Sequence, residues 1–227
     1  MDIAVLQQQL LSREQIARRL ARELRDGWLV NVGIGMPTLV LPYVPADRNV
    51  LFHSENGIVG MGPPPEALED EDPDLLSAGK NPVTLVTGGS YVHHADSFSI
   101  VRGGRLDAAI LGAFQVAENG DLANWKLPGL RGGNVGGAMD IAVGAREVFA
   151  MMTHVTRDGA HKIVKSLDCP VTAMGVVTKI FSDMAVIAVT SDGLVLEEIA
   201  PSLTVEDVQA VTGPCLITAE APRTIAV

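Results

Sequence analysis

Four short apolar runs in the first half of the chain end at a glycine or in small polar residues, and this pattern constrains the fold most. They lie at residues 28–32, 49–52, 83–87 and 106–111. Short apolar runs bounded by turn residues are typical of buried strands. Segments with helical patterns lie among and after them, at residues 12–27, 38–43, 95–102, 138–145 and from 204 onward. The alternation predicts an α/β fold, with an open, mostly parallel sheet flanked by helices and glycine-rich βα loops at one edge.

The size and charge of the chain narrow the classes of protein further. Its 227 residues are 47% hydrophobic, which suffices for one sizeable core in a single domain or in two fused lobes. No repeat or low-complexity linker divides it, so we expect a single domain over residues 1–227. A net charge of -10 argues against nucleic acid or an anionic membrane as a partner. No apolar run approaches the roughly 18 residues of a membrane span, and the polar N-terminus predicts a cytoplasmic protein.

The predicted helix at residues 12–27 begins with a capping box. Ser12 can accept a hydrogen bond from an N-terminal amide while Gln15 reaches back, and Gly27 stands at the usual C-terminal position. We expect the arginines of this helix to face solvent beside glutamates, with phosphate binding as the alternative. They are Arg13, Arg18, Arg19, Arg22 and Arg25.

The run at residues 49–52 leads into a turn that carries one carboxylate, Glu55. Asn56 and Gly57 follow it, the composition of a tight turn, and no basic residue is adjacent. Loops at strand ends are where α/β proteins place chemistry, because a rigid sheet aims a short exposed segment. Taken by itself, Glu55 is better read as an ordinary solvated turn residue.

Glycines after other predicted strands allow backbone amides to approach a ligand carbonyl or phosphate. Gly33 and Gly35 follow the strand at residues 28–32, while Gly88 and Gly89 are expected in a turn after the strand at residues 83–87. Neighbouring parallel strands would bring the Gly33 loop and the Glu55 turn to the same edge of the sheet.

The segment at residues 129–137 is the most glycine-rich part of the chain and predicts a loop shaped for a ligand. Arg131 is its only basic residue, and Gly136 and Gly137 close it; Gln115 flanks the preceding loop. Residues 62–74 predict an exposed loop over or beside the site.

Other charged or metal-binding residue types give weaker signals. We expect Lys162 and Lys165 to be surface charges. His93 and His94 are adjacent, so they do not share a face of a helix or strand, and no other ligand cluster supports a metal site.

Several segments together resemble the class I coenzyme A transferases, in the subunit or half called B or beta. Residues 52–60, Phe-His-Ser-Glu-Asn-Gly-Ile-Val-Gly, resemble the active-site signature of the family. Residues 31–37 resemble its Asn-Leu-Gly-Ile-Gly-x-Pro segment, and residues 137–140, 161–163 and 203–208 resemble further segments in the right order. The resemblance therefore covers nearly the whole chain and implies a fold shared with sugar-phosphate isomerases.

The resemblance implies that Glu55 is the catalytic nucleophile and forms a glutamyl-CoA thioester. Coenzyme A would be substrate and covalent intermediate, with no permanently bound cofactor and no metal. The donor would be succinyl-CoA or acetyl-CoA and the acceptor a 3-oxo acid such as acetoacetate or 3-oxoadipate. The residues expected to bind substrate or coenzyme A are Asn31, Gly33, Gly35, Asn56, Gly57, Gly88, Gly89, Gln115, Arg131, Gly136 and Gly137.

The chain also lacks a family feature. The A-type subunit or half carries a Gly-Gly-Phe core, which is absent here, so the resemblance implies a separate A-type chain in a heterodimer or heterotetramer. Related chains carry lysines near residues 132–137, where this chain has glycines, and this departure points to a different acceptor. Two alternatives stay open: a CoA-ester hydrolase or hydratase with Glu55 as general base, and a non-catalytic binding protein that partners the enzyme.

Overall fold

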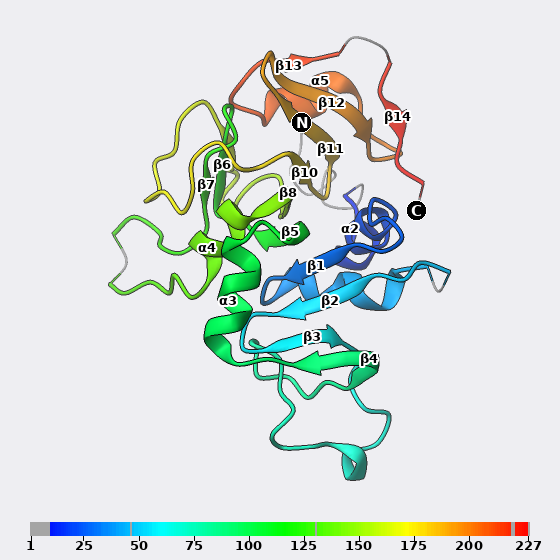
Figure 1. Ribbon diagram of the computed structural model, residues 1–227. Helices are drawn as coiled ribbons and strands as arrows, with labels where there is room; N and C mark the ends of the chain where they lie inside the picture. Colours follow the sequence, from blue (N-terminus) through cyan, green and yellow to red (C-terminus); the bar gives the residue numbers. More distant parts are fainter. Residues whose placement is uncertain (1–9, 46, 130, 219–220, 227) are drawn as a thin grey trace.

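A computed structural model describes residues 10–45, 47–129, 131–218 and 221–226, and within these residues one large sheet dominates (Figure 1). The strands of this sheet are β1 (Leu29–Val32), β2 (Leu51–Ser54), β3 (Ile58–Met61), β4 (Leu85–Tyr91), β5 (Leu106–Gly112), β8 (Ala145–Met151), β10 (Lys179–Phe181), β11 (Ala185–Thr190), β12 (Gly193–Ile199), β13 (Leu216–Ile217) and β14 (Arg223–Thr224). A smaller sheet contains β6 (Gln115–Ala117), β7 (Leu122–Ala123) and β9 (Ile163–Val164). The helices are α2 (Arg13–Ala21), η1 (Met36–Tyr43), η2 (Leu68–Asp70), α3 (His94–Arg102), α4 (Ala138–Gly144) and α5 (Val205–Ala210).

The middle of the large sheet is parallel. Its strand order is β13-β12-β11-β10-β8-β5-β1-β2-β3-β4, with β14 on β12, and every pair from β10 to β2 is parallel. Antiparallel strands flank it on both sides, β3 and β4 at one end and β11 and β12 at the other. The prediction of an open, mostly parallel sheet is confirmed. The carboxyl ends of β8, β5, β1 and β2 therefore meet at one edge.

The prediction of a glycine turn after residues 83–87 is wrong. Gly88 and Gly89 lie inside β4, where the pairing with β3 shifts register between Val59 and Met61. A Cβ on Gly60 would lie 2.8 Å from the Cα of Gly89, so the two backbones need glycine for their close approach. Two adjacent glycines after an apolar run can therefore mark a β-bulge as well as a turn.

The predicted strand at residues 49–52 exists but lies further along the chain. β2 begins at Leu51, which is 40% exposed, and continues through His53 and Ser54, which are buried. The cause is its parallel pairing with β1, in which Asn31 is opposite His53. Two polar side chains therefore enter the core directly before the Glu55 turn.

The first helix starts as predicted and ends earlier. Ser12 and Gln15 form the capping box, with the Gln15 amide donating to Ser12 Oγ over 3.2 Å. The helix ends at Ala21 rather than near Gly27, and the guanidinium of Arg48 donates to the carbonyls of Arg22 and Leu24 just beyond it.

The prediction that all arginines of this helix face solvent is wrong for Arg19. Its guanidinium is buried and donates to both carboxylate oxygens of Glu198, over 2.6 and 3.0 Å. The bidentate pair joins α2 to β12, which supplies the hydrogen bonds that a buried charge needs.

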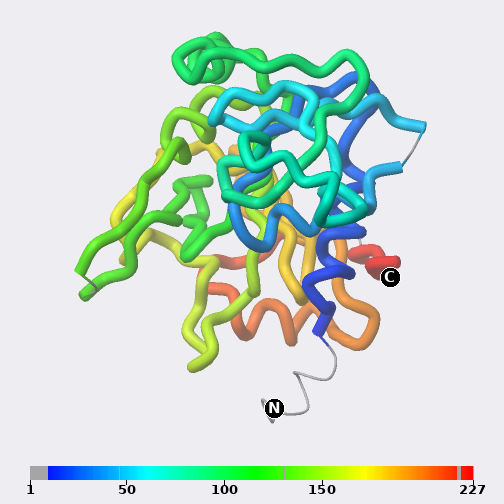
Figure 2. Tube along the Cα trace, turned by 90° about the horizontal axis from the view of Figure 1, so that it is seen from below, coloured from blue at the N-terminus to red at the C-terminus, as the bar shows by residue number. Residues whose placement is uncertain are grey.

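The remaining helices and loops flank the sheet. α3 packs against α4, and α2 packs against η1. Residues 62–74 form the predicted exposed loop, interrupted only by η2, at the β3–β4 end of the molecule (Figures 1 and 2). Among the described residues, no helix combines the length and apolar character needed to cross a membrane.

Candidate active site

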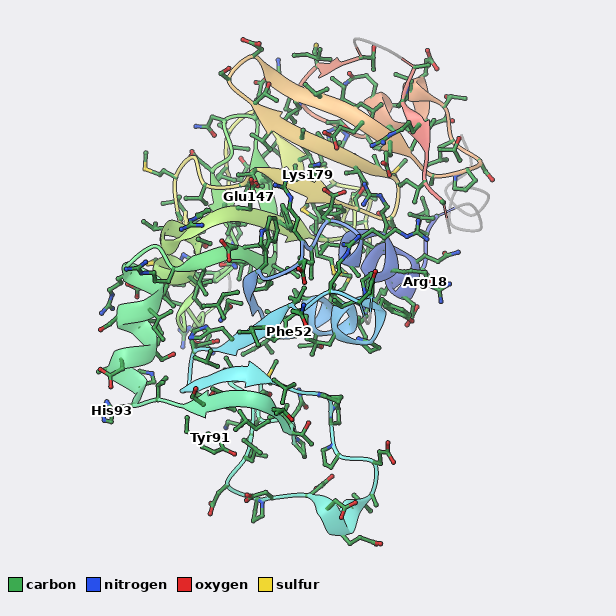
Figure 3. The ribbon with its side chains drawn as sticks, turned by 45° about the vertical axis from the view of Figure 1, so that its right-hand side comes forward. Arg18, Phe52, Tyr91, His93, Glu147 and Lys179 are labelled. Atoms are coloured by element: carbon green, nitrogen blue, oxygen red, sulfur yellow. The ribbon has the colours of Figure 1, made fainter. Side chains whose placement is uncertain are left out.

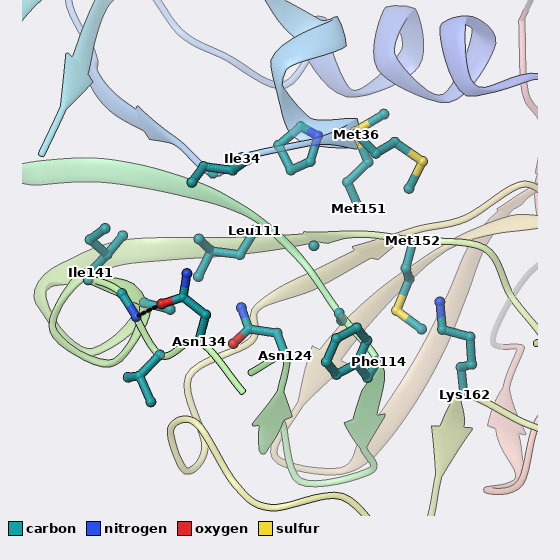
Figure 4. Close-up of a pocket in the computed structure, with 18 of the residues that line it drawn as sticks. Ile34, Met36, Leu111, Phe114, Asn124, Asn134, Ile141, Met151, Met152 and Lys162 are labelled. Carbon is teal, nitrogen blue, oxygen red and sulfur yellow. Dashed lines mark hydrogen bonds between the residues drawn. The ribbon is translucent and has the colours of Figure 1, made fainter. Parts of the chain in front are cut away.

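A cleft of about 490 Å³ opens at the edge where the parallel strands end. Ile34 follows β1, Glu55 follows β2, Phe114 follows β5, and Met152 follows β8, and all four line it. Figure 4 shows Ile34 and Met36 on one side of the cleft, facing Phe114 and the two asparagines Asn124 and Asn134. Open parallel sheets bind ligands at this position, outside the carboxyl ends of their strands.

The turn that presents Glu55 depends on glycine at position 57. The Gly57 amide donates to the Ser54 carbonyl over 3.0 Å, and its φ of +128° lies in the region that favours glycine. A Cβ there would come within 2.4 Å of the Val92 carbonyl oxygen. Gly57 thus shapes the turn and does not line the cleft, while Glu55 is half-buried at the cleft wall.

A second loop braces this turn from outside. The Ala78 amide donates to Ser54 Oγ over 2.9 Å, and Asn56 Nδ2 donates to the Leu76 carbonyl over 2.7 Å. The side chain of Asn56, which we expected at the substrate, is therefore used to hold the residues 76–78 loop. Two strands and one loop together fix the backbone on both sides of Glu55.

The side chain of Asn31 donates a hydrogen bond to the Glu55 carboxylate. Its Nδ2 lies 3.3 Å from Glu55 Oε2 and 3.2 Å from the His53 carbonyl oxygen, and donates to both. Asn31 is fully buried in β1, in the centre of the parallel sheet. The Gly33 loop and the Glu55 turn lie at the same edge of the sheet, as predicted, and the parallel pairing of β1 with β2 brings an amide donor to the carboxylate.

The glycines after β1 have different roles. Gly33 lines the cleft, but its amide donates to the Ile110 carbonyl over 2.8 Å, so it is not free to stabilise an oxyanion. Gly35 has a φ of +87° and precedes η1 without lining the cleft. Gly88 and Gly89, in the edge strand β4, do not line it either.

The glycine-rich segment before α4 does reach the cleft. Gly136 and Gly137 line it as expected, next to Asn134, whose Oδ1 accepts from the Gly136 amide over 3.1 Å (Figure 4). Arg131 is exposed and does not line the cleft. Gln115 is also absent from the lining, because its Oε1 accepts from the amides of residues 168 and 169 over 2.9 and 3.1 Å.

Lys162 contributes positive charge to the cleft, which contradicts its prediction as a surface residue. It is half-buried, it lines the cleft, and its Nζ donates to Thr153 Oγ1 over 3.2 Å (Figure 4). Burial lowers its pKa, and the nearby charge of Asp183 opposes that shift. Only the segment at residues 161–163, which resembles the family, could have directed attention to it.

A second cation, Arg13 from the first turn of α2, also lines the cleft. The periodicity of the helix had placed Arg13 on a solvated face, and it is indeed exposed. Its contribution depends on where the tertiary fold brings α2, which the local sequence does not encode.

The histidine pair at residues 93 and 94 has structural contacts. His93 caps α3 by accepting from the Ala95 amide over 3.2 Å, and the ring of His94 lies 5.0 Å from that of Phe98. Figure 3 shows His93 at the outer edge of the molecule. Within the described ranges, no group of three or more His, Cys, Asp or Glu side chains is arranged to hold a metal ion.

The sequence matches a family of known proteins over most of its length. The family model described as coenzyme A transferase matches residues 13–210. The B-type subunit of a 3-oxoadipate CoA-transferase from Pseudomonas putida is 51% identical over 91% of this chain and 97% of its own length. The B-type subunit of a probable succinyl-CoA:3-ketoacid coenzyme A transferase from Bacillus subtilis is 43% identical over 87% of this chain and 91% of its own length.

Solved structures support the fold. An acyl-CoA transferase apoenzyme from Escherichia coli superposes with a TM-score of 0.76 at 20% identity, over 95% of this chain and 43% of that chain. The present chain thus spans less than half the length of that structure.

Proposed function

Because the chain belongs to the coenzyme A transferase family, as a B or beta subunit, we propose that Glu55 is the nucleophile that carries coenzyme A between two acids. The donor is succinyl-CoA or acetyl-CoA, and the acceptor is a 3-oxo acid such as 3-oxoadipate or acetoacetate. The names of the relatives support this class of acceptor. Coenzyme A acts as substrate and as part of the covalent intermediate.

The proposed reaction proceeds through two carboxylate attacks. Glu55 attacks the thioester carbonyl of the donor, which gives a mixed anhydride and the coenzyme A thiolate. The thiolate attacks the Glu55 carbonyl of that anhydride, which forms the glutamyl-CoA thioester and releases the donor acid. The acceptor carboxylate then attacks the thioester, and the thiolate attacks the acceptor carbonyl of the new anhydride. The product is the acceptor's CoA ester, and Glu55 is again a free carboxylate.

The position of the Glu55 carboxylate is the observation that carries the proposal. It lies half-buried at the wall of the cleft, on a turn held by Gly57, with Asn31 Nδ2 3.3 Å from one oxygen. A carboxylate suits the role of nucleophile because the reaction exchanges one acid for another without hydrolysis. Partial burial and the Asn31 donor restrict the orientations of the carboxylate.

Lys162 and Arg13 supply the positive charge that anionic substrates need in an acidic protein. Both line the cleft together with Glu55, and the chain has a net charge of -10. We assign Lys162 to the acid carboxylate or to the oxyanion of the attack, since it is the more buried of the two cations.

A separate A-type chain completes the proposed enzyme. The relatives named above are themselves B-type subunits by name, and this chain carries no Gly-Gly-Phe core. The assembly is a heterodimer or heterotetramer with the cleft at the interface between the two kinds of chain.

The proposal is tested by the intact mass of this chain, co-expressed with its A-type partner and incubated with succinyl-CoA or acetoacetyl-CoA. We expect one coenzyme A thioester on the wild type and none on Glu55→Gln. Glu66→Gln is the matched control, because Glu66 is an exposed carboxylate outside the cleft. Thioester consumption by hydrolysis, without an adduct, would refute the transferase and support a CoA-ester hydrolase.

A further inference from the structure

A line of three buried polar side chains leads from α3 to the Glu55 carboxylate. Ser97 Oγ lies 2.9 Å from His53 Nε2, and His53 Nδ1 lies 3.1 Å from Asn31 Nδ2. Asn31 Nδ2 in turn lies 3.3 Å from Glu55 Oε2. The four residues come from α3, β1, β2 and the turn after β2, so tertiary packing brings α3 and β1 to the end of β2.

We propose that His53 and Ser97 are positioning residues for Glu55, which act by fixing the amide of Asn31. The proposal rests on the proposed role of Glu55 as nucleophile and extends it to two residues that do not line the cleft.

The neighbours of the Asn31 amide fix its orientation. Its nitrogen faces three acceptors: the carboxylate of Glu55, the carbonyl oxygen of His53 and the ring nitrogen His53 Nδ1. Rotation of the amide by half a turn would place its oxygen against the first two, which are also acceptors. The donors therefore have to point toward Glu55 and His53.

The ring of His53 is neutral and carries its proton on the side of Ser97. Burial lowers the pKa of His53 to about 4, so the ring is neutral near pH 7. Since Nδ1 faces the Asn31 amide nitrogen, which can only donate, the single ring proton is on Nε2, which donates to Ser97 Oγ. Ser97 Oγ thereby accepts the Nε2 proton and stabilises the tautomer that keeps an acceptor facing Asn31.

The other end of the Asn31 amide is unpaired within the part of the chain that the structure describes. The oxygen of the Asn31 side chain, Oδ1, is buried and has no hydrogen-bond partner among the described residues. An unsatisfied buried acceptor is unfavourable, so the amide would not keep this orientation without strong contacts on its other end. Those contacts are the ring nitrogen and carbonyl oxygen of His53 and the carboxylate of Glu55, so His53 helps to hold the amide toward the carboxylate.

The three side chains that lead to Glu55 are held rigidly. Asn31, His53 and Ser97 are all fully buried, each on a regular element. Their side chains have no solvent to replace a lost partner, so a change at Ser97 or His53 is transmitted to Asn31. Small displacements of a reacting group lower the rate of a chemical step strongly.

The experiment uses the chain co-expressed with its A-type partner and measures the rate of CoA-adduct formation by rapid quench and intact mass. We expect His53→Leu to slow adduct formation roughly 100-fold and Ser97→Ala roughly tenfold, with little change in the concentration of acyl-CoA that half-saturates it. His53→Gln should restore most of the rate, because a glutamine amide offers both an acceptor and a donor.

The matched control is Ser99→Ala. Ser99 is on the same helix and its hydroxyl donates to the Ala95 carbonyl over 2.9 Å, outside the line to Glu55. It should react at the wild-type rate. A folded His53→Leu protein with the wild-type rate would overturn the proposal, and so would a folded His53→Gln as slow as His53→Leu, since His53 would then act by packing alone.

Crystal structures of the wild type and of His53→Leu separate this proposal from the function on which it rests. If the wild type forms no adduct, the proposed function fails, and the structures still decide the positioning role. A displaced Asn31 amide or Glu55 carboxylate in His53→Leu supports it. Unchanged positions of both side chains overturn it.

Discussion

His53 and His154 have closely similar environments in two regions of the molecule. Both are fully buried, both have partners at both ring nitrogens, and burial lowers their pKa values to about 4 and about 3. His154 contacts Ser182 Oγ at 2.9 Å and Thr212 Oγ1 at 2.8 Å. The two hydroxyls also lie 3.1 and 2.7 Å from the carbonyl oxygens of Ala185 and Val208. Because the neutral ring has a single N–H, one of the hydroxyls donates to the ring.

The two networks differ in where they end. The one around His154 ends on backbone carbonyls of β11 and α5, so it joins the C-terminal hairpin and helix to the parallel strands. The one around His53 ends on the carboxylate of Glu55. Burial and a depressed pKa are thus the same for a structural histidine and for one that supports chemistry. The last group in the network distinguishes them.

The largest expected effect follows from removing the group at which the His53 network ends. Glu55→Gln keeps the size of the side chain and its contact with Asn31 but removes the nucleophile. We expect kcat for CoA transfer to fall by at least roughly 10⁴-fold, with normal thermal unfolding. A Glu55→Gln enzyme with a substantial fraction of wild-type kcat would contradict the account.

The next test exchanges the two histidines as targets. His154→Leu should lower the free energy of unfolding by about 2–3 kcal/mol, because two buried hydroxyls lose a partner, while the folded fraction transfers coenzyme A at the wild-type rate. His53→Leu should slow transfer roughly 100-fold. Urea unfolding and kcat are measured on both variants. The comparison is refuted if His154→Leu and His53→Leu slow CoA transfer to the same extent.

The pH dependence of stability probes what the two histidines share. Each is neutral in the folded chain near pH 5, whereas an unfolded histidine with its ordinary pKa of 6.5 is protonated. The unfolded state therefore binds more protons, and stability is lost as the pH falls below about 6.5.

Each histidine should contribute about 2 kcal/mol to the loss of unfolding free energy between about pH 7 and pH 5. In His154→Leu that loss should be smaller than in the wild type by this amount. Urea denaturation at both pH values measures it, and an unchanged loss in the variant would show that His154 is not buried in its neutral form.

The smallest expected effect concerns Lys162, a cation of the cleft whose charge also lowers the pKa of His154. Lys162→Met should raise the KM for the acid substrate roughly tenfold, because it removes a half-buried positive charge from the cleft wall. Lys165→Met is the matched control, since Lys165 is exposed and does not line the cleft. Equal KM values for the two variants would remove Lys162 from the site.

The sequence predicted those features that depend on local pattern. The alternation of apolar runs and helical segments predicts the parallel sheet, and the small polar residues around Glu55 predict the turn that carries it. The capping box at Ser12 follows from the same kind of signal.

The errors all depend on contacts between distant residues. Gly88 and Gly89 have the composition of a turn, but β3 draws them into a strand. Arg19 has the periodicity of a surface residue, but Glu198, 179 positions away, pairs with it in the core. Lys162 lies in an irregular segment that only the tertiary fold brings to the cleft. His53 could not be given a role, because its partner Ser97 is 44 positions away.

In the proposed mechanism, Glu55 exchanges one carboxylate oxygen with the substrate acid through an anhydride. The most direct test incubates the enzyme, acyl-CoA and an acceptor acid whose carboxylate carries heavy oxygen, and then measures the mass of the peptide that contains Glu55. The mechanism predicts that one heavy oxygen appears in Glu55, because the bridging oxygen of the anhydride remains on Glu55 when the thiolate attacks the acceptor carbonyl. An enzyme that turns over while this peptide stays unlabelled would contradict the account, since Glu55 would then act without bonding to either acid.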